Sequence, residues 1–165
     1  MTAGNAIRDA VRRLGQAGVK SPQVDVEWLL ADLLSCNRSE IPLHAQTDLP
    51  AEDLDRFFRS VERRTRREPL QHILGTANFF GYDFQVSAEV LIPRPETEVL
   101  VELALEFLVH LPNPSVFDLG TGSGCIALSL AKRCPKASII GSDVSRKALA
   151  LAKANAVSLG TLNQV

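Results

Sequence analysis

The sequence predicts an α/β protein in which a helical N-terminal part precedes alternating strands and helices. Apolar residues recur at helical spacing from Ala3 to about Leu74, which predicts a small helical bundle. From Ser115 onward, two short apolar runs alternate with helical patterns, which predicts parallel strands joined through helices. A glycine-rich turn directly after the first of these runs marks a candidate ligand-binding loop.

The composition sets limits on the class of protein. A chain of 165 residues with 45% hydrophobic residues can form one domain or two small ones. Its 18 Lys and Arg residues balance 19 Asp and Glu residues, so we expect neither nucleic-acid nor membrane binding. No segment has the pattern of a leader or a membrane span, and the three cysteines lack metal-ligand spacing. We therefore expect a cytoplasmic protein with reduced thiols and no metal site.

Three helices are expected in the N-terminal part. Ser21-Pro22 begins the second helix, because proline suits the first helical position, and the third helix follows Pro50. The residues expected to face the core are Ile7, Val11 and Leu14 in the first helix, Val24, Trp28, Leu29 and Leu33 in the second, and Leu54, Phe57, Phe58 and Val61 in the third.

The third helix ends in an arginine-rich run, "RSVERRTRREP". One interpretation is a basic patch for an acidic or nucleic-acid partner. The other is a solvated helix face, in which the cations stabilise the helix C-terminus. We prefer the second interpretation because Glu62 and Glu68 dilute the positive charge.

A hairpin and a further helix connect the two parts. The aromatic and β-branched residues of "ANFFGYDFQV" predict a short hairpin around Gly81. Pro95 then begins a helix that carries Glu96 and Glu98 in its first turn, either as a catalytic pair or, as we prefer, because acids favour a helix N-terminus. The buried row expected on this helix is Leu100, Leu103, Ala104, Phe107 and Leu108.

These patterns divide the chain into three segments. Residues 1–75 form a helical domain, residues 76–94 a β-hairpin linker, and residues 95–165 the part with alternating strands and helices. In the last segment "SVFDL" and "ASIIGSD" are the strands.

The glycine turn in "VFDLGTGSGCIALSLAK" can be compared with three known loops. A phosphate-binding P-loop is excluded, because Cys125 and Ile126 stand where Gly and Lys are required. The dinucleotide pattern G-x-G-x-x-G/A fails from Gly120 but fits from Gly122, since alanine can replace its last glycine. On the glycines alone, a dinucleotide site therefore remains open.

Two acidic residues favour a different cofactor. Asp118 ends the first strand, and with the alternating glycines it matches the first motif of S-adenosylmethionine-dependent methyltransferases. That cofactor carries no phosphate, so it tolerates a carboxylate that would repel a pyrophosphate. Asp143 ends the second strand, where a carboxylate can accept both hydroxyls of a ribose, although it could also simply cap the next helix.

Four stretches together resemble one family in the same order along the chain: "REPLQHILG", "FFGYDFQV", "VLIPRPETE" and "FDLGTGSGCIALSLAK". They are similar to the peptide chain release factor N5-glutamine methyltransferases, the HemK/PrmC family. The resemblance implies a helical N-terminal domain, a hairpin linker and a Rossmann-like methyltransferase domain that uses S-adenosyl-L-methionine. It also implies that release factors are the partner, methylated on the glutamine of their Gly-Gly-Gln motif and gripped in part by the helical domain.

The resemblance assigns site residues by position. The cofactor loop would consist of Gly120, Thr121, Gly122, Ser123 and Gly124, and Asp143 would bind the ribose. Residues 94–98, from Arg94 to Glu98, would lie beside the cofactor pocket.

One motif of the family does not occur in this sequence. The family's Asn-Pro-Pro-Tyr motif orients the substrate amide, whereas the Asn-Pro here, Asn113-Pro114, precedes the first strand and is followed by Ser115. No catalytic residue is therefore predicted. We expect a truncated, N-terminal part of such an enzyme, inactive alone; the alternatives are a non-catalytic fragment that binds release factors, or a dinucleotide-dependent oxidoreductase.

Overall fold

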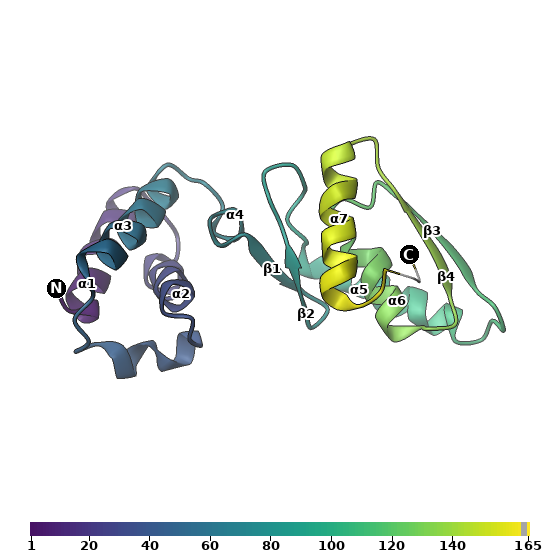
Figure 1. Ribbon diagram of the computed structural model, residues 1–165, viewed down its shortest axis with the longest axis horizontal. Helices are drawn as coiled ribbons and strands as arrows, with labels where there is room; N and C mark the ends of the chain where they lie inside the picture. Colours follow the sequence, from purple (N-terminus) through teal and green to yellow (C-terminus); the bar gives the residue numbers. More distant parts are fainter. Residues whose placement is uncertain (163–164) are drawn as a thin grey trace. The chain divides into compact units, whose positions relative to one another are not determined.

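The computed structural model describes residues 1–162 and 165 and divides the chain into two compact units, Met1–Leu74 and Gly75–Val165 (Figure 1). The first unit consists of helices only: α1 (Ala3–Gln16), α2 (Pro22–Leu34), the 3₁₀ helix η1 (Arg38–His44), α3 (Ala51–Thr65) and the short α4 (Leu70–Leu74). Among the described residues, no helix combines the length and the apolar character that crossing a membrane requires.

The core of the first unit lies between α1, α2 and α3. Helix α1 contributes Leu14 and a row of small residues, Ala3, Ala6 and Ala10, that are fully buried. Helix α3 contributes Phe57 and Val61, whose predicted burial is confirmed, while Leu54 and Phe58 pack against them partly buried. This unit therefore has a hydrophobic core of its own.

Helix α2 differs from the prediction in the face that it buries. Leu29 is buried and Leu33 packs partly buried against the core, as predicted, but Val24 and Trp28 are exposed, and Val26 and Leu30 are buried instead. The reason is Asp25, an acid that is buried because its Oδ2 pairs with Arg64 Nε at 2.7 Å. This ion pair places a carboxylate on the inward face of α2, which apolar spacing alone does not reveal.

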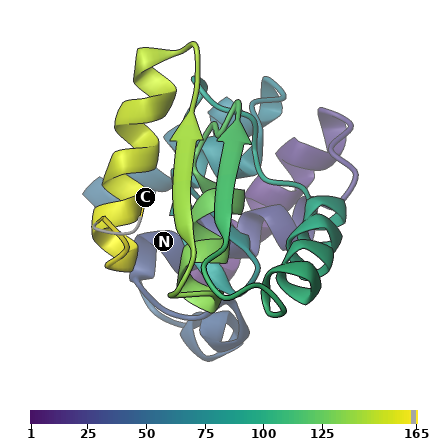
Figure 2. The same cartoon turned by 90° about the vertical axis from the view of Figure 1, so that its right-hand side faces the viewer.

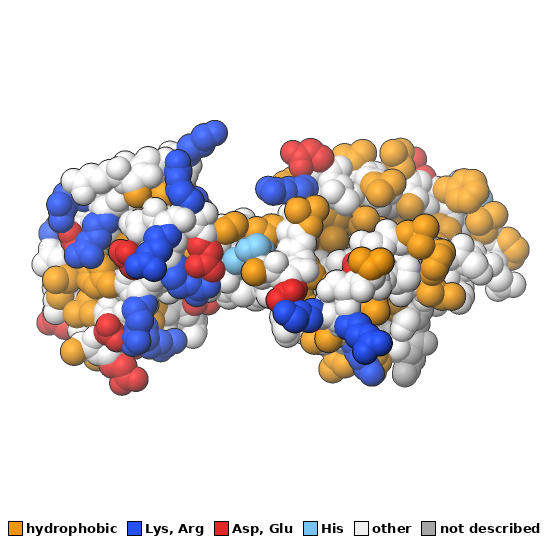
Figure 3. Space-filling view, turned by 90° about the horizontal axis from the view of Figure 1, so that it is seen from above, with side chains coloured by type: hydrophobic (Ala, Val, Ile, Leu, Met, Phe, Trp, Pro, Cys, Tyr) orange, Lys and Arg blue, Asp and Glu red, His pale blue; other side chains and the backbone are white. Residues whose placement is uncertain are grey.

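The arginine-rich end of α3 is neutralised within the first unit. Arg59 pairs with Asp55, Arg63 with Glu68, Arg64 with Asp25, and Arg66 with Glu62. Arg67 donates to the carbonyl oxygen of Gly18 at 2.8 Å. In Figure 3, blue and red side chains accordingly lie next to one another over this unit. The structure supports the interpretation as a solvated helix face.

In the second unit, the described residues form a hairpin, a two-stranded parallel sheet and three helices. The hairpin pairs β1 (Thr76–Phe79) with β2 (Tyr82–Gln85), with Phe79 opposite Tyr82. Helix α5 (Pro95–Leu108) leads to β3 (Ser115–Leu119), α6 (Cys125–Arg133), β4 (Ser138–Ser142) and α7 (Arg146–Leu159). Strands β3 and β4 are parallel, with Ser115 opposite Ser138 and Leu119 opposite Ser142. The predicted fold class, a helical part followed by an α/β part, is confirmed.

The hairpin packs into the core of the second unit. Its turn consists of Phe80 and Gly81, which adopt positive φ angles of 54° and 79°, as a two-residue turn requires. The Glu98 carboxylate of α5 accepts a hydrogen bond from the Phe80 amide at 2.9 Å. Phe79 and Phe84 are buried together with residues of α5 and α6, and their rings meet edge to face.

The two faces of the parallel sheet differ. Ile139 is buried and Val116 half-buried on the face that α6 covers, while Phe117, Leu119 and Ile140 are exposed on the other. Figure 2 shows α6 behind the two strands, with their other face turned to the viewer.

Helix α5 also buries a different row from the predicted one. Ala104 and Leu108 face the core as expected, together with Val101 and Leu105, whereas Leu100, Leu103 and Phe107 are exposed. Helix α5 is apolar on more than one side, so its sequence period does not single out the inward face.

Candidate functional site

The predicted loop and Asp143 lie next to each other at the carboxyl ends of the two parallel strands. The loop residues Gly120–Gly124 connect β3 to α6, and Asp143 follows β4 directly. The amides of Gly120 and Thr121 both donate to the carbonyl oxygen of Ser142, each at 2.8 Å. The parallel pairing thus brings all six predicted site residues into one region, as open α/β sheets do at their binding crevice.

The three loop glycines have different structural roles. All have positive φ angles: 75° at Gly120, 57° at Gly122 and 82° at Gly124. A Cβ atom would meet nothing within 4 Å at Gly120 and only a loop oxygen at 4.0 Å at Gly122, so the backbone there borders open space. At Gly124 a Cβ atom would lie 2.9 Å from Leu128 Cδ1 and 3.3 Å from Ala152 Cβ. Gly124 therefore allows α6 and α7 to pack, while Gly120 and Gly122 leave backbone accessible to a ligand.

Asp143 fixes the loop and the start of α7 together. Its Oδ2 accepts from the Gly122 amide at 3.0 Å, and its Oδ1 accepts from the Ser145 amide at 2.8 Å. The hydrogen bonds from these two amides hold the pKa of the Asp143 carboxyl below its usual value, and the bond from Ser145 has the larger effect. The ionised carboxylate is acceptor-only and has about four lone-pair sites, so capacity remains for ligand hydroxyls. A structural role and a binding role are thus compatible in this residue.

Thr121 links the loop to β3 and β4. Its Oγ1 donates to Asp118 Oδ2 at 2.7 Å, so Asp118 orients the turn. A Cβ atom at Gly141 would lie 3.0 Å from Thr121 Oγ1, which makes Gly141 the position that leaves room for this hydrogen bond. Gly141 was not predicted as a site residue, although a glycine inside the strand "SIIGS" is a known sign of close approach.

Ser123 is buried, and its carbonyl oxygen accepts a hydrogen bond from Asn155 Nδ2 at 2.8 Å. Asn155 was missed by the sequence interpretation, because its partners are distant along the chain. Two positions after Ser123, burial is the main cause that raises the pKa of the Cys125 thiol, and Asp118 raises it further. Cys125 thus remains a protonated thiol at neutral pH.

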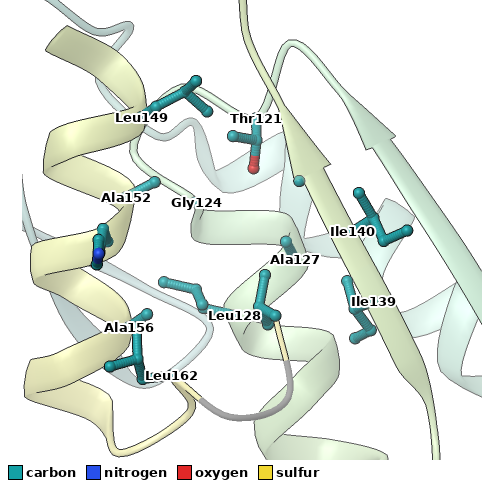
Figure 4. Close-up of a pocket in the computed structure, with 13 residues that line it drawn as sticks. Thr121, Gly124, Ala127, Leu128, Ile139, Ile140, Leu149, Ala152, Ala156 and Leu162 are labelled. Atoms are coloured by element: carbon teal, nitrogen blue, oxygen red, sulfur yellow. The ribbon is translucent and has the colours of Figure 1, made fainter. Parts of the chain in front are cut away.

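An apolar cavity borders the loop, and the loop residues Thr121 and Gly124 are among its lining residues. It has a volume of about 380 Å³ and lies between β4, α6 and α7, with Ile139, Leu128 and Ala156 among its lining residues (Figure 4). Its lining is mostly aliphatic, with Thr121 and Lys153 as the polar side chains. Within residues 1–162 and 165, no three His, Cys, Asp or Glu side chains are grouped so as to hold a metal ion.

The fold and the site define a class of protein. A glycine turn between a parallel strand and a helix, with an acid at the end of the neighbouring strand, is the arrangement of Rossmann-like domains that bind nucleoside cofactors. Each of the two units matches a different family model. Residues 5–75 match the PrmC N-terminal domain, and residues 97–164 match the methyltransferase small domain.

Curated relatives carry both parts in one chain. The release factor glutamine methyltransferase of Koribacter versatilis is 42% identical over 159 residues, which cover 96% of this chain and 57% of the relative. That of Moorella thermoacetica is 40% identical, covering 100% of this chain and 58% of the relative. That of Geobacter sulfurreducens is 45% identical over 143 residues, covering 87% and 50%. The chain thus carries a PrmC N-terminal domain followed by part of a methyltransferase small domain, is similar to release factor glutamine methyltransferases over most of its length, and spans 50–58% of the length of these three relatives.

Proposed function

We propose that this chain contributes the cofactor-binding loop and the helical substrate-binding domain of an S-adenosyl-L-methionine-dependent methyltransferase acting on release factors. The target is the side-chain amide of the glutamine in their Gly-Gly-Gln motif. The observation that carries the proposal is the loop Gly120–Gly124 joined to Asp143 through the Gly122 amide at 3.0 Å. The family matches of both units support it.

The residues present fit this cofactor. Open space beside Gly120 and Gly122 allows backbone to approach the methionine portion, and the Asp143 carboxylate can accept the ribose hydroxyls. When bound, the cofactor supplies an electrophilic methyl group on its sulfonium. The Asp118 carboxylate already accepts a hydrogen bond from the Thr121 hydroxyl, so in this proposal Asp118 orients the loop.

The proposed activity has a requirement that these 165 residues do not meet. An amide nitrogen is a poor nucleophile, and acceptors must orient it toward the methyl group. The Asn-Pro-Pro-Tyr sequence that does so in the family is not among these residues. We therefore assign cofactor and release-factor binding to this chain, and expect no methyl transfer by the chain alone. A purely binding role toward release factors is the second candidate.

Calorimetric titration of the chain with S-adenosylhomocysteine, and separately with NAD, tests the proposal. We expect heat of binding with the first ligand only. Binding of NAD alone would contradict the proposal and favour the dinucleotide alternative. Incubation with a release factor and labelled S-adenosylmethionine should transfer no label above background; clear transfer would mean that Asn-Pro-Pro-Tyr is not needed.

A further inference from the structure

Asn155 of α7 connects two segments that lie far from it in sequence. Its side chain is 1% exposed, and every hydrogen bond that it makes is to backbone. Oδ1 accepts from the Gln85 amide at 2.8 Å, while Nδ2 donates to the Gln85 carbonyl at 3.0 Å and to the Ser123 carbonyl at 2.8 Å. Both hydrogens of the side-chain amide are thus used.

The two hydrogen bonds with Gln85 satisfy the N–H and C=O groups of a residue on strand β2 of the hairpin. Gln85 is the last residue of β2, and its partner on β1 is Thr76. An amide that bonds both the N–H and the C=O of one strand residue does what the peptide group of a neighbouring strand would do. The Asn155 side chain therefore joins the backbone of the hairpin to α7 by hydrogen bonds, in addition to the packing of apolar side chains.

The third contact reaches the glycine loop near its end at α6. Ser142 and Asp143 hold Gly120, Thr121 and Gly122, whereas Asn155 holds the Ser123 carbonyl just before α6 begins. Ser123 is itself buried, so its carbonyl oxygen has no access to solvent as a substitute partner. The loop is thereby fixed at both of its ends.

We propose that Asn155 is a positioning residue of the cofactor site, which couples the hairpin to the glycine loop and keeps the loop in its binding conformation. The inference rests on the proposed function, because it takes the loop as the cofactor site. In this view the hairpin β1–β2 is a structural part of that site. Asn155 acts through Ser123 and does not touch the cofactor.

The substitutions Asn155→Asp and Asn155→Leu separate the contribution of the Nδ2 donor from that of the whole side-chain amide. Asn155→Asp keeps the acceptor for the Gln85 amide but places a carboxylate against two carbonyl oxygens, and Asn155→Leu removes all three hydrogen bonds at similar volume. Asn78→Asp is the matched control, since Asn78 lies on the same hairpin and bonds only the exposed Asp83 side chain. Val157→Gly is a second control, which weakens the same helix at an exposed position.

We expect both Asn155 variants to bind S-adenosylhomocysteine about tenfold or more weakly, while both controls retain the affinity of the original chain. The amide resonances of Gly124 and Val86 should shift together in the Asn155 variants only. Undiminished affinity with unshifted resonances would overturn the inference. If the original chain binds no S-adenosylhomocysteine, the proposed function fails, and the paired resonance shifts still decide the role of Asn155.

A measurement on the unaltered chain covers the case in which the variants do not fold. The side-chain NH₂ protons of Asn155 should exchange with solvent far more slowly than those of Asn78 and show proximity to both Gln85 and Ser123. Exchange as fast as that of Asn78 would overturn the inference.

Discussion

Asp143 shows how one residue can stabilise a site and remain available to a ligand. It holds the Gly122 amide with one oxygen and the Ser145 amide with the other, so the loop and α7 depend on its negative charge. From the sequence, capping a helix and binding a ribose are rival explanations of this acid. In the structure, Asp143 holds the start of α7 through the Ser145 amide. Its remaining lone pairs are still available to the hydroxyls of a ribose.

The lowered pKa of Asp143 predicts a pH dependence of the loop. A depressed carboxyl pKa means that its contribution to stability is present above the ordinary aspartate pKa, about 3.9, and is lost as the pH falls through the folded value. We expect the Gly122 amide resonance to keep its position down to about that pH and to shift only below it. A transition midpoint above the ordinary aspartate value would contradict the hydrogen bonds assigned to this carboxylate.

Gly141 of β4 should be sensitive to substitution because of its contact with Thr121. Gly141→Ala places a Cβ atom 3.0 Å from Thr121 Oγ1 and should cost the second unit about 1–3 kcal/mol in its free energy of unfolding. Urea unfolding followed by circular dichroism measures this loss. Trp28, the one tryptophan of the chain, lies in the first unit, so its fluorescence transition should stay unchanged.

Gly15→Ala is the matched control for this substitution. A Cβ atom at Gly15 meets nothing within 4 Å, and the residue lies in α1. This change should be neutral or stabilise the first unit by up to about 1 kcal/mol. Equal effects of the two substitutions would show that contact with Thr121 is not what constrains Gly141.

At the scale of whole elements, the predictions were correct where the pattern of an element's own residues determines its structure. Strand β3 coincides with the predicted "SVFDL", and α3 buries the expected Phe57 and Val61. The predicted inward faces of α2 and α5 were only partly correct, because a buried ion pair and an excess of apolar residues do not appear in periodicity. Asn155 and Gly141 could not be found from sequence pattern alone, since their roles depend on contacts 70 and 20 positions away.

The hairpin provides the test at this scale. Phe84 is fully buried among residues of α5 and α6, so Phe84→Ala should destabilise the second unit by about 3–5 kcal/mol. Phe107→Ala, at an exposed position of α5, should change it by no more than about 0.5 kcal/mol. Comparable small losses for both variants in urea unfolding would mean that the hairpin is a loose attachment.

At the scale of the molecule, the second unit exposes an unusual amount of apolar surface. Phe117, Leu119 and Ile140 are 59%, 74% and 59% exposed on the uncovered face of the parallel sheet. Among the described residues, β3 and β4 each pair with one strand, so each has an edge without a neighbour. Exposed apolar faces and open strand edges favour association between chains.

We therefore expect the chain to self-associate through the second unit as its concentration rises. Sedimentation velocity should detect this association, and Leu119→Lys should reduce it by placing a charge on the sheet face. Leu43→Lys is the control, since Leu43 is 82% exposed in the first unit. A chain that stays monomeric at all concentrations, or one for which both variants act alike, would contradict this expectation.

The cofactor site is tested most directly by adding S-adenosylhomocysteine to the isotope-labelled chain and to its Asp143→Ala variant. Two charge-assisted hydrogen bonds of about 1.5–3 kcal/mol each predict at least about a tenfold loss of affinity in the variant. In the unaltered chain, the amide resonances of Gly120–Gly124 and Asp143 should shift first and most. Shifts confined to other residues, or an equal affinity in the Asp143→Ala variant, would contradict the placement of the cofactor at this loop.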